Sequence, residues 1–178
     1  MIMQIDKKEY NPELHTKYKA LCVKQPYADY LTNIDWEDSE GNLHAKKSIE
    51  VRSRKTNYRG DILICSSAKP EIVGRMSGVT CGMVEIYDIK RVEDFTPEDW
   101  ENTCIPEDKR PKTGWGWLVR NPRRCVEMDV KGQLGIYDLI MPKDDLTYYP
   151  VVLKLDEEEW EQMNERIEKM RNEKVESK

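Results

Sequence analysis

Short apolar runs separated by turn-forming residues dominate the chain from residue 19 to residue 139. Runs of this length are typical of strands. The pattern predicts strands at 19–23, 49–52, 61–66, 78–89, 116–120, near 125–128 and at 135–139. Gly82, inside the longest run, indicates a bulge or a close approach of backbone. Many short strands with only brief helices favour an α+β fold built on a small closed or nearly closed β-barrel.

Two short helices and one insertion interrupt these strands. Pro26 is preset for the first turn of a helix that we expect to end near Thr32. Thr96–Asp99 contains a capping threonine, a proline and two acidic residues, which predicts a second helix that ends before Pro106. Residues 33–45 contain a polar turn cluster, and we expect them to form an inserted hairpin or loop.

The C-terminal segment, residues 156–178, differs from the rest in its periodicity. Apolar residues recur there at steps of three and four, at Trp160, Met163, Ile167 and Met170. This pattern predicts an amphipathic helix that follows a barrel domain spanning residues 1–155. The apolar stripe is short for a coiled coil, so we expect the helix to dock on the barrel of a monomer. Recruitment of a protein partner by this helix is the alternative.

Composition narrows the class of protein. The 178 residues suit one domain, and they include no apolar run long enough to span a membrane and no leader segment, so we expect a soluble, cytoplasmic protein. The five cysteines form no Cys-x-x-Cys pair and are expected to be reduced and structural. His15 and His44 have no partners at ligand spacing, so neither a metal nor another cofactor is expected.

The net charge of −5 conceals a segregation along the chain. Residues 46–75 contain eight basic and three acidic residues, and residues 109–131 contain seven basic and two acidic residues. Residues 85–108 contain nine acidic and two basic residues. Segregated charge can form a basic face, and the local field rather than the net charge attracts a phosphate backbone. A nucleic-acid partner therefore remains compatible with an acidic protein.

The strand at 49–52 carries charges that a buried strand does not need. If Ile49 and Val51 face the core, Glu50 and Arg52 share the opposite face, and Lys47 lies at the strand entrance. These three charged residues are candidates for lining a cleft. The simpler interpretation is an ion pair between Glu50 and Arg52 that holds the sheet edge, and such a pair could also support a functional lysine.

Further candidates for nucleic-acid contact lie in a turn and in a late strand. Tyr58 and Arg59 precede a glycine in a predicted turn, where Arg59 either binds phosphate or is simply solvated. Trp115 and Trp117 flank a glycine and point the same way in an extended segment. Basic residues follow them at Arg120, Arg123 and Arg124. An aromatic face beside arginines suits base stacking with phosphate contact, although aromatic residues at this spacing also occur in cores.

Several blocks of sequence agree in order with one known family. They are ALCVKQPYA at 20–28, KSIEVR at 47–52, NYRG at 57–60, GWGWLVRNPRR at 114–124 and VKGQLGIY at 130–137. From about Tyr18 to Met141 the chain resembles the ASCH family, whose domain is named for homology to activating signal cointegrator. The resemblance implies a PUA-like β-barrel with a Lys, Glu and Arg cleft beside the first helix. It therefore implies recognition of RNA or another nucleic acid through a base or a modified nucleotide.

One branch of that family contains enzymes, which leaves a catalytic alternative open. Small amidohydrolases of this branch deacetylate N4-acetylcytidine with a Lys, a Thr and a downstream Glu. The Lys matches Lys47, but the Thr position is occupied by Glu50. Some family members are ribonucleases, for which Lys47 and Glu50 would be plausible proton-transfer groups. We expect a binding protein rather than an enzyme, because the matching threonine is absent.

Overall fold

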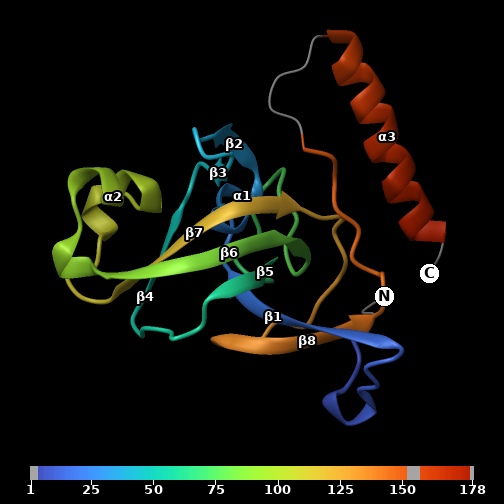
Figure 1. Cartoon of the computed structure of the whole chain (residues 1–178), viewed down its shortest axis with the longest axis horizontal. Coiled ribbons are helices and arrows are strands. Elements are labelled where there is room, and N and C mark those ends of the chain that lie inside the picture. The colour runs from blue at the N-terminus through green and yellow to red at the C-terminus, as the bar shows by residue number, and fades with distance from the viewer. Residues whose placement is uncertain (1–3, 152–156, 177–178) are drawn as a thin grey trace.

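Six strands form one strongly curled sheet in the order β4-β7-β6-β5-β1-β8 (Figure 1). The structure, a computed structural model, describes residues 4–151 and 157–176. The strands of this sheet are β1 (His15–Val23), β4 (Ile49–Arg52), β5 (Gly60–Ser66), β6 (Thr80–Arg91), β7 (Trp115–Arg124) and β8 (Ile136–Pro142). β1 and β5 are parallel, and the other neighbours are antiparallel. Within the described residues β4 and β8 are unpaired edges, so the expected barrel is an open half-barrel.

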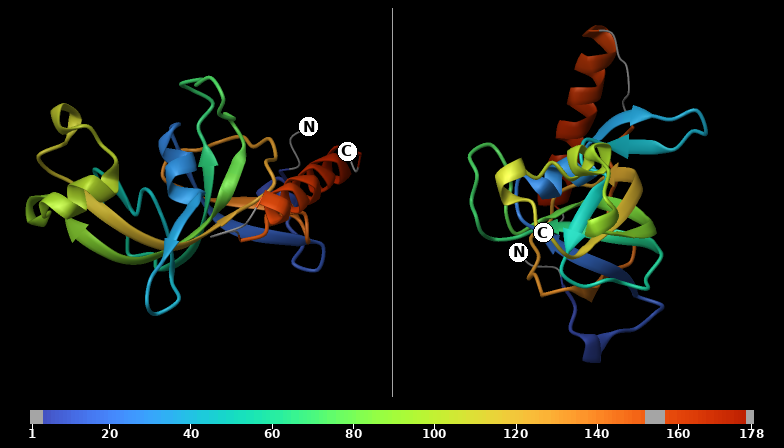
Figure 2. Two further views of the ribbon diagram at one scale, coloured as in Figure 1. Left: turned by 90° about the horizontal axis from the view of Figure 1, so that it is seen from above. Right: turned by 90° about the vertical axis from the view of Figure 1, so that its left-hand side faces the viewer.

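Apolar side chains alternate between the two faces of this sheet. Ile62 and Ile64 of β5 belong to the cluster beneath α1 (Tyr27–Thr32), whereas Leu63 and Cys65 belong to a cluster on the other face. The helix α1 lies in the concavity of the sheet (Figure 2). Both faces are therefore buried, which explains why β5 is almost continuously apolar.

Several strands extend beyond their predicted ends, β1 and β7 by the most, and one predicted strand is absent. β1 begins at His15 because its first residues pair with β8 across the full length of that strand. β7 continues to Arg124 through a bulge near Asn121, whose φ is 54°. The prediction of a strand near 125–128 is wrong. Cys125 makes one isolated bridge to Tyr148, and the segment then crosses the second face, where Met128 is buried.

The remaining elements lie outside the six-stranded sheet. α2 (Pro97–Thr103) begins with the predicted threonine cap, since Thr96 and Asp99 form a reciprocal capping box. Residues 33–45 contain a hairpin of β2 (Ile34–Glu37) and β3 (Leu43–Ala45). Short 3-10 turns occur at Lys7–Glu9, Val92–Asp94 and Glu107–Lys109.

Gly82 of β6 lies where sheet and helix come closest. A Cβ atom at this position would lie 2.6 Å from the carbonyl oxygen of Arg123 and 3.1 Å from Cβ of Thr32 in α1. The register between β5 and β6 also shifts beside it. Both the close approach and the irregularity expected from the sequence are present. The absence of a side chain at 82 lets α1 sit deep in the concavity.

The C-terminal helix α3 (Glu157–Glu176) lies beside the segment that follows β8 (Figure 1). Arg171 donates a hydrogen bond of 2.9 Å to the Tyr149 hydroxyl, and Lys174 contacts Asp145. Met163, Ile167 and Met170 are partly buried. The side chain of Trp160, which the sequence also assigns to the apolar stripe, lies outside the described residues, as does the predicted start at 156.

Removal of residues 156–178 should lower the thermal unfolding midpoint, because the rest of the protein would lose its contacts with the partly buried Met163, Ile167 and Met170. Full burial of such a side chain stabilises a fold by about 1.5–3 kcal/mol, so partial burial contributes less. Circular dichroism of the full and shortened chains measures the change, with the exposed substitution Glu165→Ala as control. An unchanged midpoint after truncation would show that α3 is an independent appendage.

Candidate functional site

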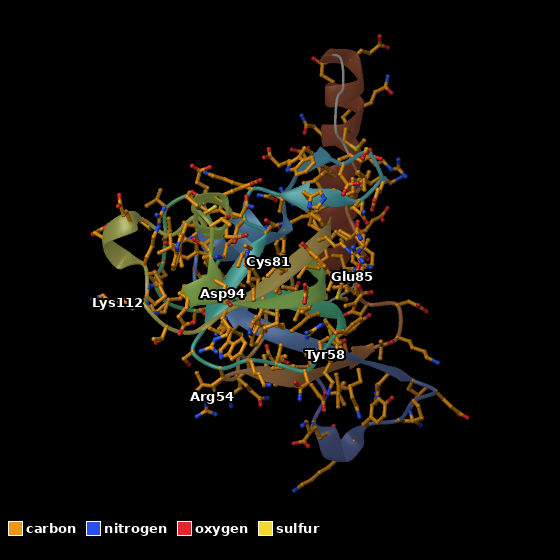
Figure 3. All side chains as sticks on the ribbon, turned by 60° about the vertical axis from the view of Figure 1, so that its left-hand side comes forward. Arg54, Tyr58, Cys81, Glu85, Asp94 and Lys112 are labelled. Atoms are coloured by element: carbon orange, nitrogen blue, oxygen red, sulfur yellow. The ribbon has the colours of Figure 1, made fainter. Side chains whose placement is uncertain are left out.

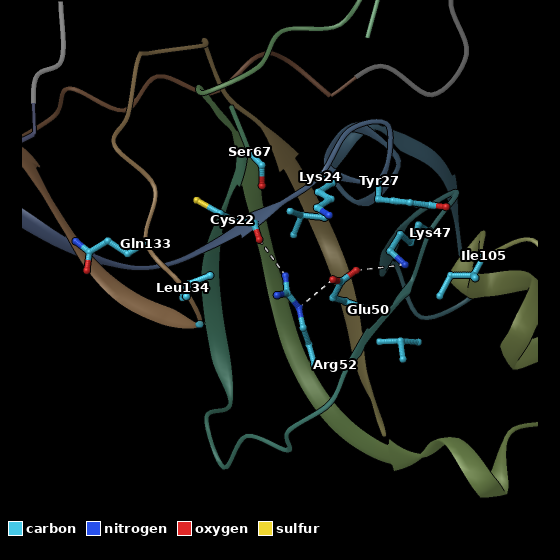
Figure 4. A pocket seen from close by; sticks show the side chains of 13 residues that line it. Cys22, Lys24, Tyr27, Lys47, Glu50, Arg52, Ser67, Ile105, Gln133 and Leu134 are labelled. Atoms are coloured by element: carbon cyan, nitrogen blue, oxygen red, sulfur yellow. Dashed lines mark hydrogen bonds and ion pairs between the residues drawn. The ribbon is translucent and has the colours of Figure 1, made fainter. Parts of the chain in front are cut away.

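A cleft of about 360 Å³ opens at the unpaired side of the half-barrel (Figure 4). Its lining comes from the end of β1, the start of α1, β4, the loop after α2 and the loop before β8. One edge strand, β4, lines the cleft directly, and the loop that leads into the other edge strand, β8, lines it from another side. The cleft occupies the place where a closed barrel would continue its ladder of hydrogen bonds.

Lys47 lies at the bottom of this cleft and is only 1% exposed. Its ammonium donates hydrogen bonds of 2.8 Å to the Ile49 carbonyl and 2.7 Å to the Thr103 carbonyl. A carboxylate oxygen of Glu50 lies 3.3 Å away. Thr103 ends α2, and the C-terminal end of a helix favours a positive charge. The ammonium is thus held by two hydrogen bonds and one ion pair. Lys47 therefore holds Glu50 in place and joins it to α2.

Glu50 and Arg52 share one face of β4, as strand alternation predicts. The second carboxylate oxygen of Glu50 lies 3.0 Å from Nε of Arg52. The guanidinium also donates a hydrogen bond of 3.0 Å to the carbonyl of Cys22 at the end of β1. Figure 4 shows this chain of contacts running from Lys47 through Glu50 to Arg52. The ion pair and the cleft, which were alternatives in the sequence, are parts of one arrangement.

The walls of the cleft are aromatic and apolar. The Tyr27 ring of α1 lies 5.2 Å from Nζ of Lys47 and meets Tyr30 edge-on, with ring centres 6.3 Å apart. At the opposite lip the Leu134 side chain is 100% exposed, in the loop before β8. Tyr27 and Leu134 were not singled out from the sequence. Tyr27 begins α1 and Leu134 lies in a loop, so their positions depend on how distant segments pack. The only local signals were the two sequence blocks, at 20–28 and 130–137, that contain them.

The three arginines of β7 do not line the cleft. Arg120 makes two hydrogen bonds to Glu85, of 3.1 and 3.2 Å, and Arg123 binds Asp61 at 2.6 Å. Arg124 is paired with carboxylates on both sides, Asp29 at 2.7 Å and Glu127 at 3.3 Å. Figure 3 shows Glu85, the partner of Arg120, well apart from Arg54, which lies two residues after the end of β4. Each of these arginines is thus matched by an acidic partner.

The other predicted contact residues also lie outside the cleft lining. The Tyr58 hydroxyl donates a hydrogen bond of 2.5 Å to the carbonyl of Asp61, and Arg59 donates to the carbonyls of its own turn. Trp115 is paired across the strands with Arg52 and therefore lies on the same face. The structure brings Lys47, Glu50 and Arg52 together, with Trp115 as a neighbour of Arg52.

The cysteines form no disulfide and belong mainly to the core. All five are free, and Cys65, Cys81 and Cys125 are buried. Burial raises the pKa of the Cys81 thiol to about 11 and that of Cys125 to about 12. Both therefore remain thiols at neutral pH. In the part of the chain that the structure describes, no group of three histidine, cysteine or carboxylate residues is placed to hold a metal ion.

The chain matches the model of a known protein family. The model of the ASCH domain matches residues 43–177. The chain belongs to the ASCH domain family. The match includes β4 with its charged residues and extends through α3. No curated protein matches the chain significantly. Across residues 4–151 and 157–176, no helix is long and apolar enough to cross a membrane.

Replacing Glu50 with alanine should destabilise the fold strongly, because it leaves Lys47 and Arg52 without their shared carboxylate. Removing one partner of a buried ion pair typically costs about 3–5 kcal/mol. Glu50→Gln retains the shape and some hydrogen bonding, so its effect should be smaller. The control is Glu71→Gln, which breaks an exposed ion pair with Lys69 and should have no measurable effect. Urea denaturation measures these changes, and equal stability of Glu50→Ala and the native protein would contradict this account.

Asp29 should make stability depend on pH in acid. Burial raises the pKa of this carboxyl, but hydrogen bonds and charge from Arg124, with a hydrogen bond from Arg75, lower it more, so its pKa lies below the ordinary value. A depressed pKa stabilises the fold above the unfolded value of about 3.9, and this contribution disappears as the pH falls through and below it.

The variant Asp29→Asn should therefore be less stable than the native protein at pH 7 and should approach it at low pH. Denaturation at a series of pH values tests this, with Asp35→Asn, an exposed site, as control. A constant difference between Asp29→Asn and native protein from neutral to acid pH would contradict the assignment.

Proposed function

We propose that this protein binds RNA, or another single-stranded nucleic acid, by accepting an unstacked base in the cleft beside β4. Membership of the ASCH domain family supports a function of this class. The observation that carries the proposal is the fixed pair of Glu50 and Arg52 on the cleft floor. It places a hydrogen-bond acceptor directly beside a donor.

Such a pair matches the edge of a nucleobase. Each carboxylate oxygen of Glu50 can accept more than one hydrogen bond, so both retain capacity after binding Lys47 and Arg52. An exocyclic amino group can donate to the carboxylate, and a ring nitrogen or carbonyl can accept from the guanidinium. The Tyr27 ring offers a wall for stacking. A volume of about 360 Å³ lies within the usual range for small-ligand sites.

Binding is favoured over catalysis by the contacts of Lys47. In the enzymatic branch that the sequence resembles, a lysine and a threonine occupy the positions of Lys47 and Glu50. Here the ammonium of Lys47 donates hydrogen bonds to two carbonyls and forms an ion pair with Glu50. A lysine that is held in this way supports its neighbours, and it would have to leave these contacts to transfer a proton to a ligand.

Arg52→Lys should reduce the affinity for single-stranded RNA by about tenfold to a hundredfold, because lysine keeps the charge but loses the planar donor fork. Fluorescence anisotropy with a labelled random RNA pool measures the effect. The matched control is Arg120→Lys, which alters an arginine bound to Glu85 outside the cleft and should leave affinity unchanged. Binding should weaken steeply with salt, as phosphate contacts require.

Three results would contradict the proposed function. Absence of RNA retention by the native protein even at low salt would end the nucleic-acid proposal. Release of acetate from N4-acetylcytidine, or cleavage of RNA, that disappears in both Lys47→Ala and Glu50→Gln variants with intact folds would replace binding by catalysis. Greater sensitivity to Arg120→Lys than to Arg52→Lys would move the site to β7.

A further inference from the structure

Two aromatic rings outside the cleft are each flanked by two cations. The Tyr30 ring of α1 has Nζ of Lys46 at 4.3 Å from its centre and the guanidinium carbon of Arg75 at 5.0 Å. The Trp115 ring of β7 has Nζ of Lys55 at 5.8 Å and the guanidinium carbon of Arg91 at 5.7 Å. Both rings are partly exposed. Neither arrangement is needed to build the cleft floor.

These two sites lie on either side of the cleft. Tyr30 touches Tyr27, which is a wall of the cleft, and Trp115 is the cross-strand neighbour of Arg52 on its floor. Lys46 and Lys55 belong to the chain just before and just after β4. Nine steps of chain separate these two lysines, so their backbones lie at most about 30 Å apart. The sites and the cleft therefore form one track along β4.

The two lysines of this track differ from the arginines of β7. Its two arginines do not, because Arg75 lies 2.9 Å from Asp29 and Arg91 lies 3.6 Å from Glu93. The arginines at 120, 123 and 124 are each paired with a carboxylate. By contrast, Lys46 and Lys55 make no ion pair with a carboxylate within the described ranges, and their side chains lie over aromatic rings instead. Their charge is therefore available to a polyanion, and the local field favours one although the protein as a whole is acidic.

We propose that the cleft binds one nucleotide within a longer single strand of nucleic acid, and that the neighbouring nucleotides lie at the Tyr30 and Trp115 sites. Alternating rings and cations are the elements that bind single strands, because rings stack on bases and cations contact phosphates. The track rests on the proposed function of the cleft and adds to it the ligand's length and position. A double helix could not place a base in the cleft without losing its pairing.

The test compares ligands of different length with the full chain. The probes are cytidine monophosphate, an RNA of about ten nucleotides and a DNA of the same sequence, in the length range of known single-strand sites. The oligonucleotides should bind at least about tenfold more tightly than the mononucleotide. Lys46→Ala and Lys55→Ala should each weaken oligonucleotide binding several-fold and reduce the salt dependence by about one phosphate contact. Binding of cytidine monophosphate, which fills only the cleft, should change far less.

The control variant is Lys17→Ala. Lys17 also lies over an aromatic ring, with Nζ 4.3 Å from the Tyr10 centre, but neither residue lines the cleft or borders β4. This substitution should leave oligonucleotide affinity unchanged. Trp115→Leu should weaken the oligonucleotide about tenfold through lost stacking, and thermal unfolding checks that its fold survives. The two lysine substitutions test the track even if that variant does not fold.

The outcomes separate this inference from the function on which it rests. Two results would overturn the track and leave the cleft assignment intact, provided that binding depends on Arg52. One is an affinity that is independent of ligand length, and the other is an affinity that neither Lys46→Ala nor Lys55→Ala changes. Equal affinity for polyglutamate and the oligonucleotides would also overturn it, since stacking would then have no role. If none of the nucleotide probes binds, both proposals fail. Tighter binding of either RNA or DNA, with the expected response to Lys46→Ala and Lys55→Ala, would support the track and identify the sugar preferred.

Discussion

On the open side of the half-barrel, side chains join elements that the described strands do not connect by pairing. Glu50 accepts contacts from Lys47 and Arg52, and Arg52 reaches the backbone of β1 at Cys22. Lys47 extends the same network to the last carbonyl of α2. Interactions of this kind are strong when complete and costly when one member is lost. The shape of the cleft and the position of its polar groups therefore have a common origin.

The sequence predicts the elements of the fold and the residues of the cleft floor better than it predicts their surroundings. Alternation along a strand is a local property, so Glu50 and Arg52 could be assigned to one face without a structure. The partners of Arg120 and Arg123, and the Asp29 partner of Arg124, could not, because these carboxylates lie 35, 62 and 95 positions away in the chain. The full lengths of β1 and β7 likewise depend on distant strands rather than on local pattern.

Charge segregation along the chain had a different outcome in each of its two basic segments. The arginines of β7 meet acidic residues and become part of the structure. Near β4, lysines lie over Tyr30 and Trp115 instead. Counting charges in a segment cannot distinguish these cases, because pairing is decided by the fold. The carboxylate partner distinguishes them in space, because Arg120 also lies over a ring, that of Tyr87, but is paired with Glu85. A ring alone leaves a cation charged and reachable.

The close approach at Gly82 links the far end of the sheet to the dimensions of the cleft. The missing side chain sets how deeply Thr32, and with it the rest of α1, can sink into the concavity. Tyr27 begins that same helix and forms one wall of the cleft. The contact of Thr32 with Gly82 therefore sets the depth of α1 at its last residue, and this depth fixes the position of Tyr27 at its first residue. A single methyl group added at position 82 would act on the width of the cleft without touching any residue that lines it.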